Sequence, residues 1–451
     1  MTKTPRIRRY ALLGASLCVL ASQMPAMAQD VEAAPAEAPA DRSLKLGSIV
    51  VTAQRREESI NDVPMSIQAF GEDTLDALRV DSVDDLQNVV PSFSVSQSYQ
   101  GVPTYTLRGI GFNTINVSAT STVGTYVDEV AYPYPFMNSG PVFDIQRVEV
   151  LKGPQGTLFG RNTTAGLINM VTNKPSDEFE GSVTADVGNY DTWNLEGILN
   201  VPISDRAQAR FGIRSENSDE GWQKSITSGQ DRGTKDKLGF RAALALQPTD
   251  NLDVDISYNG WRSKSDTTGG QAIALTPNTD PTFIVPGTNG PSTTSLFNAV
   301  DPVTGLSLVD FVNNNFPTSA EQTDWAPNYA RTTAGIGVNG IDGPLEEDTK
   351  FDALKLSVRY GFDNGLNLVS LTGYNKLDRE AVLDFSSAPF AILVQDVDAE
   401  IKSFSQELRL EGETGKANWL VGAYYGKDET TDTNRTLLLD NANSSYVSTI
   451  A

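Results

Sequence analysis

The second half of the chain alternates between hydrophobic and polar residues over long stretches. In "NLDVDISYNGW" (residues 251–261), Leu252, Val254 and Ile256 share one face of an extended chain, and the residues between them are polar. This period of two predicts β-strands with one apolar face. About nine such strands are predicted, near 181–188, 192–203, 208–216, 235–247, 251–262, 350–362, 366–377, 401–411 and 418–428. Several reach the roughly 9–11 residues that a tilted strand needs to cross a bilayer.

The connections between these strands alternate in length. Short turns are predicted near 204–207, 247–251, 362–366 and 412–417, and long polar loops at 217–234, 263–349 and 378–400. Short turns on one side, long loops on the other and aromatic residues near strand ends are typical of outer-membrane barrels. A soluble β-sandwich would alternate too, but it does not require two classes of connection. We therefore predict a transmembrane antiparallel β-barrel, of which this chain holds about nine strands.

The segment from Ile60 to about Pro175 has a different pattern. Helical spacing appears in "GEDTLDALRV" and in "DSVDDLQNVVPS", where Asp81 or Ser82 is the expected N-cap and Pro91 ends the helix. Short strands are predicted at 92–96, 104–108, 124–130, 147–151 and 167–172. This is an α/β unit of ordinary domain size.

The first 28 residues have the features of an export signal. Lys3 and three arginines precede the uncharged run 10–22, which is too short to span a bilayer. The A-x-A sequence at 26–28 predicts cleavage after Ala28. Lipid attachment at Cys18 is a weaker alternative, because Leu17 stands where a small residue is needed. Residues 29–47, rich in Ala, Pro and Glu, are expected to be a flexible leader.

Composition narrows the chemistry of the mature chain. The net charge is −22, and removing the signal leaves 31 of the 35 basic residues against 57 acidic ones, which argues against nucleic acid as a partner. There is no histidine, and the single cysteine lies in the signal. Ser-His and Cys-His pairs and zinc motifs are therefore excluded, and we expect no catalytic site, metal or cofactor. A secreted hydrolase would need an acid–base constellation that is not recognisable here.

A glycine-rich stretch, "VEVLKGPQGTLFGRNTTAGLINMVTNKP", runs from Val148 to Pro175. A phosphate-binding loop would need Lys directly after its second glycine, but Arg161 follows Gly160, and Pro154 removes a backbone N–H. The stretch is therefore not expected to bind nucleotide. A second isolated segment, "SIVVTA" at 48–53, has two open interpretations. It is either the first strand of the α/β domain or a detachable strand that adds to a sheet edge on a partner.

Five segments, in order, resemble motifs of the TonB-dependent outer-membrane receptors. They are "SIVVTA", "DVPMSIQAF", "LRGIGFN", "GTYVDEV" and "FDIQRVEVLKGPQGTLFGRNTTAGLINMVTNKP". The resemblance covers essentially the whole chain. It implies a signal peptide at 1–28, a leader at 29–47, a TonB box and linker at 48–57, a plug domain at 58–175 and the N-terminal part of the barrel at 180–451. A closed barrel of about 22 strands would need roughly 600 residues at this spacing, so the chain resembles a truncated receptor.

The resemblance also assigns residues. The TonB box, captured by the TonB energy transducer of the inner membrane, would be Ser48, Ile49, Val50, Val51, Thr52 and Ala53. The plug motif would comprise Arg108, Gly109, Glu149, Gly153, Gly156, Gly160 and Arg161. Its glycines, with Gly166, would permit positive φ and close packing. Its charged residues, with Arg147 and Lys152, would face a polar lumen and be paired, or would lie in a solvated loop, a reading that is equally open for Lys152.

Candidate ligand contacts on the plug loops are Gln100, Asn113, Asn116, Tyr132, Tyr134 and Phe136. The aromatic and proline cluster at 132–136 could equally be a rigid turn that binds nothing. The implied function is TonB-energised uptake of a scarce solute across the outer membrane, most often a ferric siderophore or similar iron chelate. Glycan, haem or cobalamin uptake is the alternative cargo. A passive porin is the alternative class, although it would need neither a detachable strand nor a globular N-terminal domain.

Overall fold

A computed structural model describes residues 50–438, apart from 53–54, 57, 99, 115, 272–304, 306–310, 312–313, 316, 329–330, 332–340, 390, 392 and 416. The expected signal peptide and leader, and Ser48, Ile49 and Ala53 of the expected TonB box, lie outside the described residues. In the described part, no helix has the length and apolar character needed to cross a membrane.

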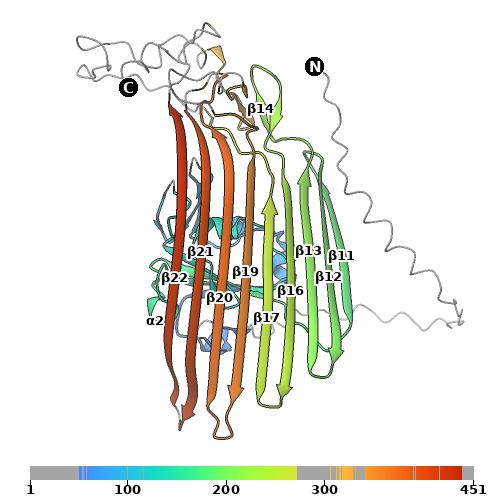
Figure 1. The fold of residues 1–451 in the computed structure, drawn as a ribbon, viewed down its shortest axis with the longest axis vertical. Coiled ribbons are helices and arrows are strands. Elements are labelled where there is room, and N and C mark those ends of the chain that lie inside the picture. Colours follow the sequence, from blue (N-terminus) through green and yellow to red (C-terminus); the bar gives the residue numbers. More distant parts are fainter. Residues whose placement is uncertain are drawn as a thin grey trace, which may run out of the picture. The chain divides into compact units, whose positions relative to one another are not determined.

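Nine long antiparallel strands form one sheet, as predicted, and each pairs with the next in sequence (Figure 1). They are β11 (Glu180–Gly188), β12 (Thr192–Ser204), β13 (Ala207–Ser218), β16 (Asp236–Thr249), β17 (Leu252–Ser263), β19 (Glu347–Gly361), β20 (Asn367–Asp384), β21 (Leu393–Thr414) and β22 (Ala417–Leu438). Short turns, such as the one between β16 and β17, leave a strand beside its predecessor, and strands joined by long loops, such as β17 and β19, are adjacent as well.

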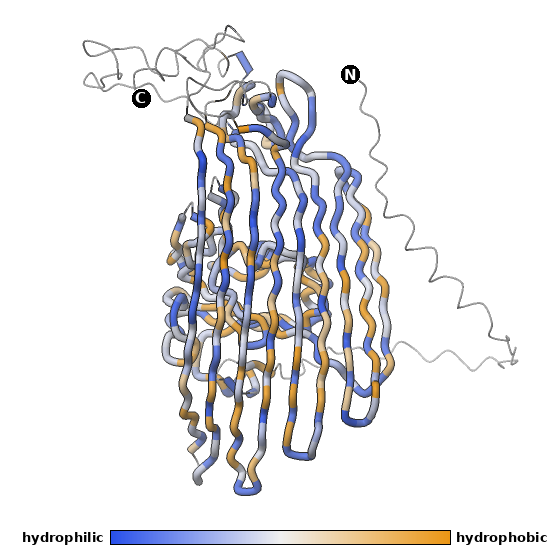
Figure 2. The backbone as a smooth tube through the Cα atoms, in the orientation of Figure 1, coloured by the Kyte–Doolittle hydropathy of each residue, from blue (hydrophilic) through white to orange (hydrophobic). Residues whose placement is uncertain are grey.

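The alternation in these strands is inverted relative to that of a soluble protein. On β16, Leu238 and Phe240 are 47% and 43% exposed, whereas Arg241 on the opposite face is buried. Large apolar residues along the other strands are exposed in the same way, for example Val187, Leu354 and Leu408. Figure 2 shows these hydrophobic positions along the middle and lower lengths of the strands, with more hydrophilic residues at their upper ends. An apolar outer face and a polar inner face are the pattern of a membrane barrel.

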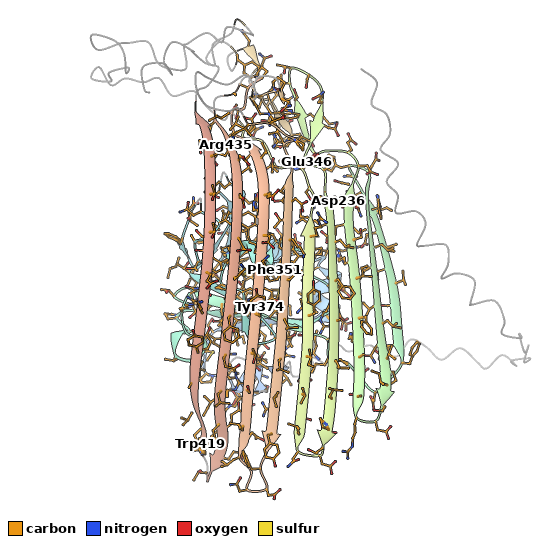
Figure 3. The ribbon with its side chains drawn as sticks, viewed as in Figure 1. Asp236, Glu346, Phe351, Tyr374, Trp419 and Arg435 are labelled. Atoms are coloured by element: carbon orange, nitrogen blue, oxygen red, sulfur yellow. The ribbon has the colours of Figure 1, made fainter. Side chains whose placement is uncertain are left out.

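Three strands are longer than predicted. β20 has 18 residues, and β21 and β22 have 22 each. The prediction of a loop at 378–400 was therefore wrong, because only residues 385–392 lie between β20 and β21. In the extension of β21 the alternation is reversed, because Val397 and Ala399 are buried against the α/β unit and Asp398 is exposed. Strands with an outward apolar face therefore do not predict it. Figure 3 places Trp419 near the end with the short turns and Asp236, Glu346 and Arg435 near the opposite end.

The predicted loop at 217–234 contains a hairpin of its own. Its strands are β14 (Gln223–Ser225) and β15 (Asp231–Arg232), and β14 also pairs in parallel with β18 (Gln322–Thr323). This small sheet lies at the upper end of the long strands (Figure 1).

The N-terminal α/β unit is built on a five-stranded sheet in the order β3-β9-β10-β7-β8. These strands are β3 (Ile67–Gly71), β7 (Val123–Val127), β8 (Val130–Ala131), β9 (Ile145–Lys152) and β10 (Gly166–Thr172). A second sheet contains β4 (Phe93–Gln97), β5 (Pro103–Leu107) and β6 (Ile110–Gly111), and β1 (Val50–Val51) pairs with β2 (Glu58–Ser59). The helical segments are α1 (Glu72–Ala77), α2 (Gly156–Phe159) and the 3-10 turns at Ile60–Asp62, Asp84–Asn88 and Pro135–Asn138.

The two predicted helices exist but are short. Asp84–Asn88 is a single 3-10 segment whose N-cap is Val83, so the expected N-cap at Asp81 or Ser82 was wrong. The Asp85 carboxylate instead accepts from the Ser82 backbone N–H at 2.8 Å. The segment is amphipathic only over one turn, with Leu86 as its buried residue.

The α/β unit packs on the polar face of the long sheet. One buried apolar cluster joins the segment around Tyr132 and Phe136 to strand residues that include Phe351 and Leu377. Tyr132 and Phe351 meet edge to face, with ring centroids 5.1 Å apart. The inner face of the sheet is thus polar on average but carries an apolar seat for the α/β unit.

Candidate functional site

The N-terminal segment is docked against the α/β unit. Val50 and Val51 pair with Ser59 and Glu58 in a two-residue antiparallel ladder. Val50 is 44% exposed, whereas Val51 is fully buried in an apolar cluster with Leu151 and Leu167. Strand β1 is therefore held by few backbone bonds and one anchoring side chain. The structure shows this segment as the first strand of the unit, and so compact a ladder is also what a detachable strand would require.

Glu149 anchors the end of this segment. Its carboxylate accepts from the Thr52 backbone N–H at 2.8 Å and from the Thr52 hydroxyl at 3.1 Å. Arg147 Nε and Asn169 Nδ2 donate to the same carboxylate at 2.8 and 3.2 Å. Glu149 was expected to face the lumen, and this is wrong, because β9 lies inside the five-stranded sheet and its residue 149 is fully buried against the N-terminal segment.

Arg55 connects the N-terminal segment to the barrel. It has φ +61, and its guanidinium is buried. It lies 4.4 Å from the centre of the Phe159 ring and pairs with Glu129 at 3.2 Å and with Glu407 of β21 at 3.8 Å. Cation–π contact and ion pairing together fix the side chain.

Arg55 belongs to a larger charged cluster, which we call the Glu129 cluster. Glu129 also pairs with Arg409 of β21 at 2.8 Å. Arg409 contacts Glu411 at 2.8 Å, and Glu411 in turn pairs with Arg359 at 3.2 Å. The cluster is Arg55, Arg359, Arg409, Glu129, Glu407 and Glu411, and Lys355 adds a further positive charge near Glu129. Each carboxylate of the cluster thus has a cationic partner, as a largely buried ionic cluster requires.

A second ionic contact joins the α/β unit to the sheet at Asp144. Its fully buried carboxylate accepts from Arg210 Nη2 at 2.7 Å and also pairs with Arg241. Arg241 further donates to the Asn173 carbonyl at 2.7 Å. The two arginines come from neighbouring strands β13 and β16, so Asp144 fixes the unit to the barrel wall.

The glycine-rich stretch folds differently from expectation. Gly153, Gly160 and Gly166 have positive φ, but Gly156 does not, so that expectation was wrong for Gly156. Gly156 instead begins the four-residue helix α2, which replaces the expected tight turn between two strands. At Gly166, φ is +144, and a Cβ would collide with the Leu151 carbonyl and lie 2.6 Å from Leu107 Cδ2.

This contrast gives a matched pair of substitutions. We expect Gly166→Ala to destabilise the protein by at least about 1–3 kcal/mol. The positive φ is strained for alanine, and the added Cβ would overlap neighbouring atoms. Gly156→Ala meets no heavy atom within 4 Å and should change stability by less than about 1 kcal/mol. Thermal unfolding of the two variants measures this, and equal losses would contradict it.

The remaining plug-motif charges lie apart from one another. Arg108 is exposed and donates to Ser66 Oγ at 2.9 Å, and Lys152 reaches the Pro91 carbonyl at 3.4 Å. Gly109 follows Arg108 with φ +78. Arg161 pairs with Asp428 of β22. Of these, Arg161 is in contact with the barrel wall.

The candidate ligand residues fall into two groups. Asn113 and Asn116 are exposed. The others are buried: Gln100 donates to Gln395 and Asn434 of the barrel at 3.2 and 3.1 Å, and Tyr132, Tyr134 and Phe136 lie in the apolar seat. Arg379 covers the Phe136 ring at 3.9 Å. Residues 132–136 are thus packed as a rigid turn would be. Ligand contact by these residues stays a prediction, and it would require the plug to move.

A cavity of about 540 Å³ lies between the α/β unit and strands β20–β22. Arg55, Glu129, Phe159 and Arg161 line it from one side, and Glu407 and Tyr424 from the other. Its volume is in the range of small-molecule sites.

The ion pairs of Glu129 predict how docking of the plug depends on pH. Burial raises the pKa of Glu129, but Arg409 and Arg55 outweigh it, and the pKa lies below its ordinary value. A lowered pKa contributes stability that is present above the unfolded value and is lost as the pH falls through the folded value. We expect docking of the plug to hold from pH 7 to 5 and to weaken below about pH 4, with a smaller change in Glu129→Gln. Protease protection across pH measures this, and loss between pH 6 and 5 would contradict it.

Comparisons with known proteins agree with this geometry. Residues 59–167 match the family model of the TonB-dependent Receptor Plug Domain. The pesticin receptor of Yersinia pestis is 30% identical over 212 residues, covering 45% of this chain and 30% of that protein. The vitamin B12 transporter of Vibrio vulnificus is 34% identical over 138 residues, covering 31% of this chain and 22% of that protein. The chain thus spans less than a third of the length of these relatives.

Solved structures share the fold. The ferric yersiniabactin uptake receptor from Yersinia pestis aligns with a TM-score of 0.59 at 18% identity, covering 83% of this chain and 50% of that one. The siderophore receptor PiuA from Acinetobacter baumannii aligns at 0.57 and 15% identity, covering 84% and 47%. The matched proteins are receptors and transporters, and together with the outward apolar strands they place this protein in the outer membrane.

Proposed function

We propose that this chain, which carries a TonB-dependent receptor plug domain on the N-terminal strands of a receptor-type barrel, serves TonB-energised uptake of a scarce solute across the outer membrane. The observation that carries the proposal is the docked N-terminal segment. A two-residue strand, one buried valine and the Glu149 carboxylate hold residues 50–52 against the plug. An attachment of this size can be exchanged for added-strand pairing with a transducer. The domain limits of the sequence analysis, with the plug at 58–175, are part of the proposal.

The most fitting cargo is a ferric siderophore or a similar iron chelate. Several similar proteins carry such cargo in their names, among them the ferripyoverdine receptor of Pseudomonas aeruginosa, which is 26% identical over 161 residues. The similarity to a vitamin B12 transporter keeps cobalamin as the second candidate. No covalent chemistry is part of this function.

The test is uptake by cells that express the protein from its own gene. Labelled ferric hydroxamates, ferric catecholates and cyanocobalamin are offered with and without an uncoupler of the proton-motive force. One chelate class should accumulate, and the uncoupler should abolish accumulation but not surface binding. Accumulation that is insensitive to the uncoupler would favour a passive porin.

A further inference from the structure

Two buried arginines lie within electrostatic reach of each other at the upper end of the long strands. Arg232 ends strand β15 of the small sheet, and Arg331 belongs to the long segment between β17 and β19. They are 4% and 3% exposed, and Asp384 at the end of β20 acts on the charges of both. We propose that Arg232 and Arg331 together bind a small monovalent inorganic anion of the chloride class. This site does not depend on the proposed function.

The pair differs from the other buried arginines in the described part of the chain. Each of the other five is ion-paired: Arg55, Arg214, Arg241, Arg379 and Arg409. Neither Arg232 nor Arg331 has a carboxylate within ion-pair distance among the described residues. A charge that is taken out of water needs a partner of opposite charge, because its desolvation is costly.

Most N–H groups of the two side chains have no protein partner. Arg232 donates through Nη2 to Thr267 Oγ1, and Arg331 donates through Nη2 to the Gly343 carbonyl at 2.8 Å. The Nε and Nη1 atoms of both arginines are buried and have no hydrogen-bond partner among the described residues. These two atoms carry more than half of the donors of a guanidinium group. Unpaired buried donors on two neighbouring cations indicate an anion site.

Three carboxylates act on the pair from a distance, and each is held by other donors. They are Asp266, Asp342 and Asp384. The buried Asp384 accepts from the backbone N–H groups of Ala326 and Ser386 at 2.7 and 2.8 Å. The other two accept from backbone N–H groups at 3.0 and 2.8 Å. These carboxylates offset positive charge without occupying the free donors, and this favours a monovalent anion over a multivalent one.

The burial of the pair favours a small ion over a charged group of a bulky solute, which could not reach side chains that are 3–4% exposed. The anion would join two segments that are far apart in the sequence. Strand β14 of the hairpin already pairs with β18, which precedes Arg331 in the long segment. A bound anion would reinforce this contact, because a ligand that binds only the folded form stabilises it. Its effect would be to fix the arrangement of the segments at this end of the strands.

Trp325 supplies an optical reporter of the site. The Arg232 guanidinium lies 5.7 Å from the centre of the Trp325 ring, so iodide bound to Arg232 would quench this indole. In the purified full-length protein, sodium iodide replaces sodium gluconate at constant ionic strength. We expect a saturable quenching phase that added chloride reverses. Arg331→Gln should weaken the apparent affinity for iodide by about tenfold or more, because it removes one of two charged donor groups and leaves Arg232 beside the reporter.

Arg435→Gln is the matched control. It removes the same charge at the same end of the strands (Figure 3), from a side chain that is 43% exposed and pairs with Asp396. It should bind iodide as the wild type does. Equal affinities in Arg331→Gln and Arg435→Gln, or quenching of the wild type that is linear in iodide, overturn the proposal. A saturable phase that is unchanged in Trp325→Phe places the anion elsewhere and also overturns it.

Bromide decides if Arg331→Gln does not fold, because this measurement uses the wild type. Crystals of the protein grown in sodium bromide should show an anomalous scattering peak within hydrogen-bond distance of Nη1 of both Arg232 and Arg331. Water in place of bromide at these atoms overturns the proposal.

Discussion

Val50→Pro is expected to abolish energised uptake while ligand binding at the cell surface persists. Proline removes the backbone N–H of residue 50 and fixes φ, so neither β1 nor an added strand on the transducer can form normally. Val50 is the discriminating position because its side chain is 44% exposed, whereas Val51 is fully buried in the plug. A Val51 substitution would therefore mix loss of packing with loss of coupling.

The matched control is Val50→Ala, which keeps the backbone donor and should retain most of the uptake. Surface binding and energised uptake of the same labelled chelate are compared in both variants. If β1 were only the first strand of the plug, Val50→Pro would lose ligand binding or fail to accumulate. Transport by Val50→Pro at the wild-type rate would show that the TonB-box assignment is wrong.

The second large effect is expected for Asp144→Asn. Asparagine keeps the shape of the side chain and tolerates the positive φ of +55 at this position. It removes the charge that faces Arg210 and Arg241, whose side chains are 11% and 4% exposed. Breaking a buried pair by removing one partner costs about 3–5 kcal/mol. We expect a loss of this order in the free energy that holds the plug to the barrel.

Denaturant unfolding and protease protection of the plug measure this loss. Asp250→Asn is the matched control, because Asp250 pairs with Arg206 where both side chains are more than half exposed. Exposed pairs contribute roughly 0–1 kcal/mol, so the control should be close to wild type. Similar losses in the two variants would mean that Asp144 is not a point of attachment.

The chain's alternation was enough to predict the nine strands. A period of two is a local property, and each strand needs only its own residues to present an apolar and a polar face. The pairing of the strands that short turns join, such as β16 and β17, could be predicted as well. The ends of β20–β22 were not predictable in this way, because their few apolar residues, such as Val397 and Ala399, face the α/β unit and the strands continue by pairing with their neighbours.

The candidate site was predictable in part. Arg241 alternates with Phe240 and Ala242 in the strand predicted near 235–247, and this places it on the face opposite the large apolar residues. Its partner Asp144 had no comparable signal, since an aspartate after Phe143 reads as an ordinary loop residue. Arg55 lay in a charged run, "QRREES", which indicates a solvated linker.

The sequence by itself thus determined the membrane-type strands, the α/β unit before them and the family they resemble, because these depend on local periodicity and motif order. Only the tertiary structure decided that Glu149 holds the N-terminal segment, that Asp144 joins the plug to two strands and that Arg55 pairs with Glu129 and with Glu407 of the barrel. These charged partners are separated by tens to hundreds of residues, and only the packing of the folded chain brings them together. Pairing is required there because an uncompensated buried charge is costly.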